Sequence, residues 1–339
     1  MITISLILII IAIIITEKRG IPWFLYHHIG ENGVSKEWFE EHLKIIDRLK
    51  MKTLRNRDVK TSLEEKGKLD KNSILLTFDD GYYNNYKYAH PLLKKYNMKA
   101  TIYLNTAYME DEKNRKFEYL SWKEIEEMSE SGIWDIQLHS HRHMPIFVNI
   151  NLERVVEEKD LLDRDIQYLY SGKAKIGYPI LGKRGEYSSK GIIVTEHAAE
   201  KFKNFYDNLN LEYSEKIKEC QKYIDTSLKD WFKYEDDTMA ERRISMDLDE
   251  NIRKIKEHCR ITPTFFCWPW GHKNKMTVDI MKRKGIYGFV TTRKGTNSLK
   301  IDVENIKRVE LRKFTPLKFK LNVLVTRNYF LGRVYQLLS

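Results

Sequence analysis

The sequence predicts an α/β fold in which parallel strands are covered by helices. Short apolar runs alternate with segments that carry apolar residues at helical spacing. Polar and charged residues follow several of these runs directly, as in TFDDG at 77–81. The composition, 42% hydrophobic with 12% aromatic residues, can supply a core for a chain of 339 residues. Such alternation is typical of a parallel sheet, either open or closed into a barrel.

The first half of the chain carries the regular alternation. Residues 73–78, SILLTF, are almost uniformly apolar, as in a strand buried on both faces. Residues 36–50 carry an apolar helical stripe, and Gly132 closes another helix. In chain order we predict strand 21–29, helix 36–50, strand 73–78, helix 82–97, strand 99–108, helix 121–132 and strand 134–140.

The alternation breaks at residues 151–235, which are rich in Lys, Glu and Asp. Charged helical segments there flank an irregular stretch with several glycines, 171–191. We interpret 151–235 as a large, mainly helical insertion in one domain that spans residues 21–339. The alternation returns with helix 249–259, strand 262–270, helix 274–284, strand 287–292 and the segment 306–311.

The N-terminal segment, residues 2–15, is uncharged and consists mostly of Ile and Leu. It is short for a bilayer core, which needs ~20 residues, and no small-x-small cleavage site follows it. The basic residues after it conflict with the usual orientation for an exported body. We interpret residues 1–20 as a membrane anchor or signal segment, uncleaved, with the body outside the cytoplasm. A buried core helix is the alternative.

The C-terminal segment, residues 317–339, combines apolar residues at helical spacing with basic residues and no acidic one. Such a helix can lie in a membrane interface. The alternative, which we favour, is that its apolar side packs on the body of the protein.

The formal net charge of +11 favours anionic partners. However, the basic residues are interleaved with acidic ones along the chain, so we do not expect a nucleic-acid partner. The three cysteines form no recognisable zinc or disulfide framework.

Two pairs of residues at predicted strand ends indicate chemistry. Asp79 and Asp80 follow strand 73–78, and HSHRH, which contains His139 and His143, directly follows the run WDIQL at 134–138. Two histidines at this spacing can reach one cation, and a carboxylate completes a catalytic metal site with open positions. The second carboxylate, Asp79, could then take a proton from water. The structural alternatives are a helix-capping Asp-Asp-Gly turn and ordinary surface or core histidines.

Three segments carry a family resemblance. TFDDG, HSxxH and FCWPWG (266–271) resemble, in order, the first three motifs of the polysaccharide deacetylase family, also called the NodB-homology domain or carbohydrate esterase family four. FLYHHIG, and VTTRKGTNS followed by IKRVEL, resemble the membrane-associated branch acting on poly-N-acetylglucosamine. The resemblance covers roughly residues 21–145 and 240–312. It implies a distorted (β/α) barrel with fewer closed strands than eight.

The resemblance also implies roles for individual residues. Asp79 would be the general base. Ser140 would support the histidine loop. The backbone N–H of Trp270 would stabilise the oxyanion, and the side chains of Trp268 and Trp270 would face a sugar or pack in the core. One divalent metal ion, zinc first, with nickel, cobalt or iron as alternatives, would be held by Asp80, His139 and His143.

Two departures from the family pattern affect these roles. Cys267 stands where many members have an arginine that orients the base, and Arg308 could supply that cation or contact substrate; an exposed strand arginine is the alternative. No histidine follows His272, so the family's late general acid is missing. We assign the acid to His272, with His141, His27 and His28 as the other candidates.

These features together predict a metal-dependent hydrolase. Its substrate would be the N-acetyl group of N-acetylhexosamine in a cell-surface or exopolysaccharide glycan. The alternatives are a weakly active or inactive, membrane-anchored glycan-binding protein on the same fold, and a deacetylase of a lipid-linked sugar.

Overall fold

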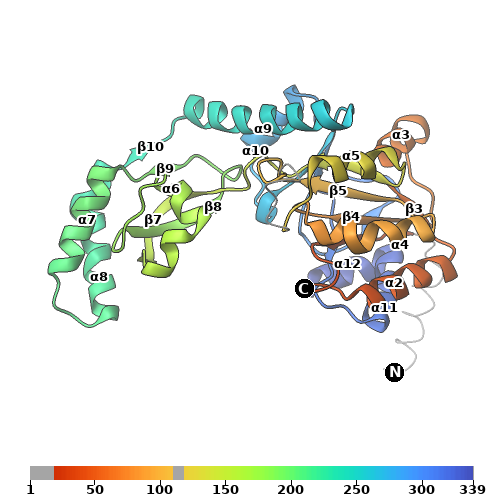
Figure 1. The fold of residues 1–339 in the computed structure, drawn as a ribbon, viewed down its shortest axis with the longest axis horizontal. Coiled ribbons are helices and arrows are strands. Elements are labelled where there is room, and N and C mark those ends of the chain that lie inside the picture. The colour runs from red at the N-terminus through yellow and green to blue at the C-terminus, as the bar shows by residue number, and fades with distance from the viewer. Residues whose placement is uncertain (1–18, 110–117, 339) are drawn as a thin grey trace, which may run out of the picture. The chain divides into compact units, whose positions relative to one another are not determined.

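The computed structural model describes residues 19–109 and 118–338 (Figure 1). These residues form two compact units. The first contains the described residues up to Arg142, Leu248–Gly271 and those from Lys282 onward, and the second contains His143–Asp247 and His272–Met281. The predicted anchor at 1–20 therefore lies outside the described residues, apart from its last two.

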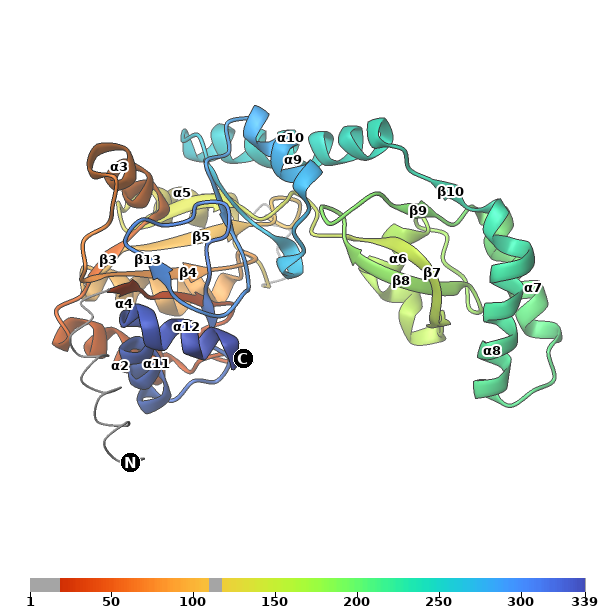
Figure 2. The same ribbon diagram turned by 180° about the vertical axis from the view of Figure 1, so that it is seen from behind.

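The first unit is built on a curled parallel sheet (Figures 1 and 2). Its strand order is β12-β11-β6-β5-β4-β2-β14, and β3 also pairs with β4. Every pairing in it is parallel, which confirms the predicted α/β fold of the half-barrel type. The strands are β2 (Trp23–Tyr26), β3 (Lys52–Leu54), β4 (Ser73–Phe78), β5 (Ala100–Leu104), β6 (Trp134–Leu138), β11 (Phe265–Cys267), β12 (Gly288–Val290) and β14 (Val309–Glu310).

Local sequence explains why these elements form. All six residues of β4 are buried, which requires the uninterrupted apolar run of a central parallel strand. The helix α2 begins after Ser35, whose side chain accepts a hydrogen bond from the N–H of Trp38 at 3.2 Å. The other helices of this unit are α3 (Asn56–Lys66), α4 (His90–Lys95) and α5 (Trp122–Glu130), beside α2 (Lys36–Arg48).

Three segments of this unit differ from the prediction. β3 and α3 were not predicted, because a three-residue strand containing Lys52 and Thr53 shows no apolar run. The predicted helix 82–97 is a π-helical turn, Asn85–Ala89, followed by α4. Pro91 is tolerated there because it lies in the first turn of α4, where no intrahelical N–H bond is lost.

The second unit contains an antiparallel sheet of order β10-β9-β7-β8, besides helices. The sheet was not predicted, although residues 148–152 alternate apolar and polar side chains along β7. Apolar residues from the sheet and helices form its core, including Phe147, Ile166, Tyr178, Phe202 and Leu228. Its elements are β7 (Pro145–Val155), η2 (Glu158–Leu162), α6 (Arg164–Leu169), β8 (Pro179–Gly185), β9 (Ile192–Ile193), α7 (Glu196–Asn208), α8 (Tyr213–Tyr223), η3 (Ile224–Leu228), η4 (Lys229–Trp231) and β10 (Lys233–Tyr234). The chain passes from one unit to the other after Arg142, within α9 (Asp237–Cys259), after Gly271 and within α10 (Lys275–Arg283).

The C-terminal segment forms two helices of the first unit rather than one. α11 (Pro316–Arg327) ends at Asn328, whose side chain accepts a hydrogen bond from the N–H of Leu331 and so begins α12 (Tyr329–Leu337). Phe319 and Val323 of α11 are fully buried, so the predicted packing against the body is confirmed for this helix. Nearby, β1 (Gly20–Ile21) pairs with β13 (Asn297–Ser298). Among the described residues, no helix has the length and apolarity needed to cross a bilayer.

Candidate metal centre and active site

The predicted site residues lie at one edge of the parallel sheet. Asp79 and Asp80 follow β4, His139 follows β6, and Cys267 ends β11. The order β11-β6-β5-β4 makes these strands neighbours, and parallel strands bring their carboxyl ends to the same edge. Segments far apart in the sequence therefore meet here.

Three of the residues predicted from sequence form a candidate metal centre. Asp80, His139 and His143 each offer one ligand atom, and the three atoms lie within 4.8 Å of one another. His139 Nδ1 lies 2.8 Å from the carbonyl oxygen of Cys267, so Nδ1 carries the proton and Nε2 is left as an acceptor. His139 Nε2 lies 3.4 Å from Asp80 Oδ1. Two imidazoles and one carboxylate fit a divalent metal and leave coordination positions open for water and substrate.

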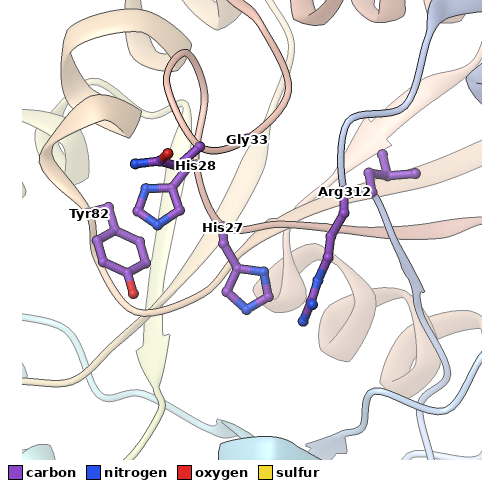
Figure 3. A pocket seen from close by; sticks show the side chains of 7 residues that line it. His27, His28, Gly33, Tyr82 and Arg312 are labelled. Carbon is purple, nitrogen blue, oxygen red and sulfur yellow. The ribbon is translucent and has the colours of Figure 1, made fainter.

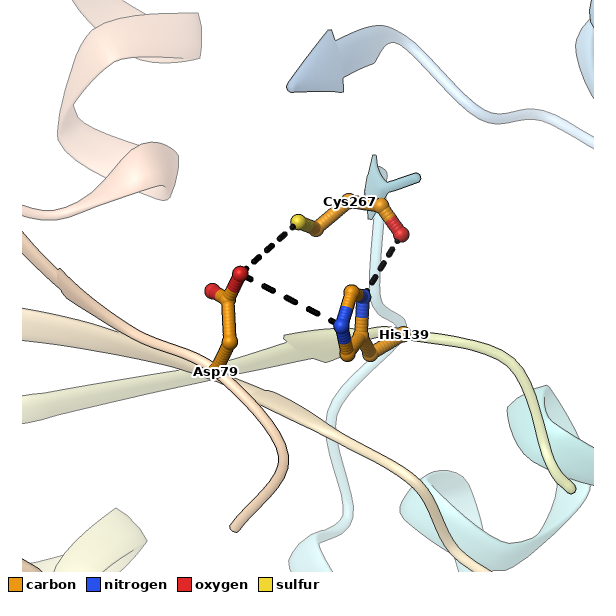
Figure 4. A group of neighbouring side chains, drawn as sticks. All are labelled: Asp79, His139 and Cys267. Atoms are coloured by element: carbon orange, nitrogen blue, oxygen red, sulfur yellow. Dashed lines mark hydrogen bonds and ion pairs between the residues drawn. The ribbon is translucent and has the colours of Figure 1, made fainter. Parts of the chain in front are cut away.

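A second group of possible ligands shares His139. The side chains of Asp79, His139 and Cys267 also lie close together (Figure 4). However, the carboxylate of Asp79 is already paired with the guanidinium group of Arg308. Arg308 Nη1 donates to Asp79 Oδ1 at 2.7 Å, and Nη2 donates to Oδ2 at 2.8 Å. The first group is therefore the better metal site.

The Arg308–Asp79 pair is fully enclosed. Arg308 has no exposed surface, and its Nε donates to the carbonyl oxygen of Thr291 at 3.0 Å. Burial alone would raise the pKa of Asp79, but the charge of Arg308 outweighs it, and the pKa lies below its ordinary value. Asp79 is thus held as a carboxylate. Arg308 is neither an exposed strand arginine nor a substrate contact, because no part of it reaches the surface.

The backbone around the site is strained. Four residues other than glycine have φ angles in the left-handed region: Asp80 (73°), Ser140 (77°), His143 (54°) and Trp270 (52°). Such angles are costly, above all for a bulky residue such as tryptophan, and they cluster at functional sites. The turn after Asp79 therefore aims side chains at the sheet edge, which a simple helix-capping turn would not require.

Part of this chain is similar in sequence to known proteins. Residues 66–182 match the family model described as polysaccharide deacetylase. The matched segment, about a third of the chain, is similar to the polysaccharide deacetylase family. Among curated relatives, YxkH of Bacillus subtilis (strain 168) is 34% identical over 135 residues, and the poly-beta-1,6-N-acetyl-D-glucosamine N-deacetylase of Staphylococcus aureus (strain MSSA476) is 32% identical over 113 residues. The matched regions cover 39% and 33% of this chain, and 46% and 39% of those relatives. The chain thus spans less than half the length of either.

Solved structures of deacetylases share the fold. The deacetylase PplD of Streptococcus pyogenes matches with a TM-score of 0.56 and 17% identity, over 91% of this chain and 99% of that one. IcaB from Ammonifex degensii matches with a TM-score of 0.53 and 16% identity, over 90% and 96%. At these identities the likeness concerns the fold alone.

The two tryptophans of the third deacetylase motif have different environments. Trp268 is fully buried and stacks on Phe289, so its side chain is a core residue and offers no surface to a sugar. Trp270 is 43% exposed, so its side chain can face a ligand.

The histidines considered as the candidate acid are also in different environments. His272 belongs to the second unit, where its Nδ1 accepts a hydrogen bond from the N–H of Gly185 at 3.1 Å. His141 Nδ1 bonds with Thr106 Oγ1 at 3.0 Å. His28 packs against Tyr82, with 3.8 Å between ring centroids and 31° between the ring planes.

His27 lies close to Asp80 of the candidate metal centre. Its Nε2 lies 4.0 Å from Asp80 Oδ2, and its Nδ1 lies 3.5 Å from Glu310 Oε1. It is partly exposed and lines a pocket of about 260 Å³ together with His28, Asn32, Gly33, Tyr82, Leu311 and Arg312 (Figure 3).

Sequence reasoning missed Asn105. This residue follows β5 directly, and its Nδ2 donates to Asp80 Oδ1 at 2.9 Å. The rule that located Asp80 and His139, a polar residue directly after a parallel strand, would also have found Asn105.

Proposed function

We propose that this chain is a metal-dependent N-deacetylase acting on N-acetylhexosamine units of a cell-surface or exopolysaccharide glycan. One observation carries the proposal: a buried, ionised Asp79, clamped by Arg308, lies beside the Asp80–His139–His143 group. A protein that only binds sugars needs no such base, so the clamp favours catalysis over the glycan-binding alternative. The Staphylococcus aureus relative is named for poly-beta-1,6-N-acetyl-D-glucosamine, and we infer a substrate of that class.

The residues present fit the proposed reaction. A bound divalent metal, for which zinc suits the donor set best, would polarise the acetamide carbonyl and acidify the attacking water. Asp79, held as a carboxylate, accepts the proton of that water. The N–H of Trp270 donates a hydrogen bond to the oxygen that gains charge. Its exposed side chain offers a flat face to the sugar ring.

Protonation of the leaving amine needs an acid, and we propose His27 for this step. It is exposed enough to meet substrate, and its ring lies close to the carboxylates of Asp80 and Glu310. His28 and His141 have ring nitrogens occupied by side-chain partners. His272, our assignment from sequence, remains the competing candidate.

We also propose that the protein is attached to a membrane. The uncharged apolar run 2–15 supports a membrane-held protein whose body faces outward. Such a position would give access to a surface glycan, and also to a lipid-linked sugar.

The test of the activity is acetate release from an oligomer of β-1,6-linked N-acetylglucosamine. A chelator should abolish release, and added zinc, cobalt, nickel or iron should restore it to different extents. Asp79→Asn should keep its metal content and lose acetate release by ~10²–10⁴-fold, because an amide cannot take the proton. Equal activity of the variant would remove Asp79 from the mechanism, and a chelator-resistant rate would remove the metal.

The proton donor is tested by comparing two alanine variants. His27→Ala should lower turnover by ~10²–10⁴-fold at unchanged metal content and with little change in substrate binding. His272→Ala serves as the matched comparison and should retain most of the turnover. The opposite result would return the role to His272.

A further inference from the structure

The helices α11 and α12 expose apolar side chains that the fold does not use. Leu317, Leu321 and Leu324 on α11 are 67%, 53% and 43% exposed. They are spaced i, i+4, i+7, so they form one stripe along the helix. The buried residues Phe319 and Val323 lie roughly opposite, at about 100° per residue. α11 therefore has two apolar faces, and only one packs against the body.

The next helix repeats the pattern. Phe330, Val334 and Leu337 of α12 have the same i, i+4, i+7 spacing and are all exposed. α12 contacts α11 directly (Figures 1 and 2). A surface with this many exposed large apolar side chains marks an interaction site rather than an ordinary solvated face. We call these six residues the C-terminal apolar surface.

The charged residues of α11 and α12 themselves are all basic. After Glu310 the sequence contains six basic residues and no acidic one. Lys318 and Lys320 are exposed on α11 and flank its leucine stripe on either side, and Arg333 is exposed on α12. Long basic side chains beside an apolar stripe can place their charges at a phosphate layer while the stripe enters the acyl region.

The first described residues lie beside the same two helices. The described chain begins at Arg19, which forms an antiparallel bridge with Asn328, the residue between α11 and α12. The adjoining strand β1 contacts both helices. The described chain therefore begins beside α11 and α12, the helices that carry the C-terminal apolar surface.

We propose that the C-terminal apolar surface is a docking face for an anionic lipid membrane. The leucine and phenylalanine side chains enter the interface, and Lys318, Lys320 and Arg333 contact lipid phosphates. This inference does not depend on the proposed deacetylase activity.

The test uses the full chain with an environment-sensitive fluorophore at Leu324→Cys, in a Cys259→Ser background. Glu65→Cys, at an exposed position on α3, is the matched control. The vesicles contain phosphatidylglycerol and phosphatidylcholine, or phosphatidylcholine alone, with or without nitroxide-labelled lipid. With anionic vesicles, emission at position 324 should shift to the blue and be quenched by the nitroxide, and emission at position 65 should not change. Lys318→Glu with Lys320→Glu should reduce quenching at 324 several-fold, whereas Lys66→Glu on α3 should leave it unchanged.

Three results would overturn the proposal. A water-like emission at 324 in vesicle-bound protein would show that this face stays in solvent. A blue shift without vesicles that grows with protein concentration would assign the face to a second copy of the chain. A blue shift without vesicles at every concentration would mean that another part of the same chain covers it.

Discussion

At the scale of single residues, the two adjacent carboxylates are tolerated because each has its own partners. Asp79 is neutralised by Arg308, and Asp80 faces Asn105 and His139. The charge of Asp79 is thus compensated within the fold, and Asp80 belongs to the candidate metal-ligand group. The separation of roles follows from which partner each side chain meets.

Replacement of Arg308 by lysine should test that compensation. A lysine cannot make the bidentate contact, so the pKa of Asp79 should rise and the carboxylate should be protonated at higher pH. The acid limb of the pH–rate profile should move to higher pH, and turnover at neutral pH should fall by ~10–100-fold. Arg312→Lys, an exposed arginine of the same segment, should leave the profile unchanged. An unshifted acid limb in a folded Arg308→Lys variant would mean that Arg308 has only a structural role.

The closeness of Asp80, His139 and His143 could be predicted from sequence because they lie within five residues of the ends of two apolar runs. The role of Arg308 could not, because it is separated from Asp79 by 229 residues and nothing local distinguishes a buried arginine from an exposed one. The same holds for Trp268, whose neighbours in the sequence do not reveal that Phe289 covers it.

At the scale of elements, the end of β5 supports both halves of the candidate centre. Asn105 bonds to Asp80, and the next residue, Thr106, bonds to His141 in the loop between the two histidine ligands. Asn251 of α9 in turn donates to Thr106 Oγ1 at 2.8 Å. One strand end therefore orients ligands that come from β4 and from the loop after β6.

Asn105→Ala should lower metal affinity by ~10–100-fold, because Asp80 loses the bond that orients it. Turnover at saturating metal should largely recover. Thr106→Val is the matched control, since it removes a bond to a residue that is not a ligand, and its effect on affinity should be smaller. Calorimetric titration of metal into both apo-proteins measures this. Equal affinities for the two variants would rule out a specific role for Asn105.

Element prediction succeeded where the pattern was long and strong. The buried run of β4 and the stripe of α2 were found, whereas the three-residue β3 and the hairpin strands near 145–185 were not. These hairpin strands were missed because one face of the β7–β8 pair is solvated. Polar and charged side chains on that face interrupt the apolar pattern of each strand.

At the scale of the whole molecule, the α/β fold followed from the alternation of strands and helices. The division into two units did not, since charged residues at 151–235 indicated an insertion but not its own sheet and core. Its core uses residues such as Ile166, Phe202 and Leu228, which stand singly among charged and polar residues and form no continuous apolar run.

The stability of the first unit should depend on pH through His42. This residue of α2 is fully buried against the segment that leads into α11. Its Nε2 lies 3.2 Å from the carbonyl oxygen of Phe314, and its Nδ1 lies 3.1 Å from the Tyr26 hydroxyl. The ring stacks on Phe319 at 4.1 Å between centroids. Burial lowers the pKa of His42 from 6.5 to about 4, although its backbone hydrogen bonds oppose the shift.

Between these two values, a falling pH protonates His42 in the unfolded chain but not in the folded one. The free energy of unfolding should therefore decrease as the pH falls from 6.5 toward 4, by up to roughly 3 kcal/mol. His42→Gln cannot titrate, so urea unfolding of this variant should lose that part of the pH dependence even if its stability at pH 7 is lower. His197→Gln, at an exposed position on α7, should keep the full dependence. If His42→Gln and the unaltered chain lose stability equally between pH 7 and pH 5, the acid sensitivity originates elsewhere in the protein.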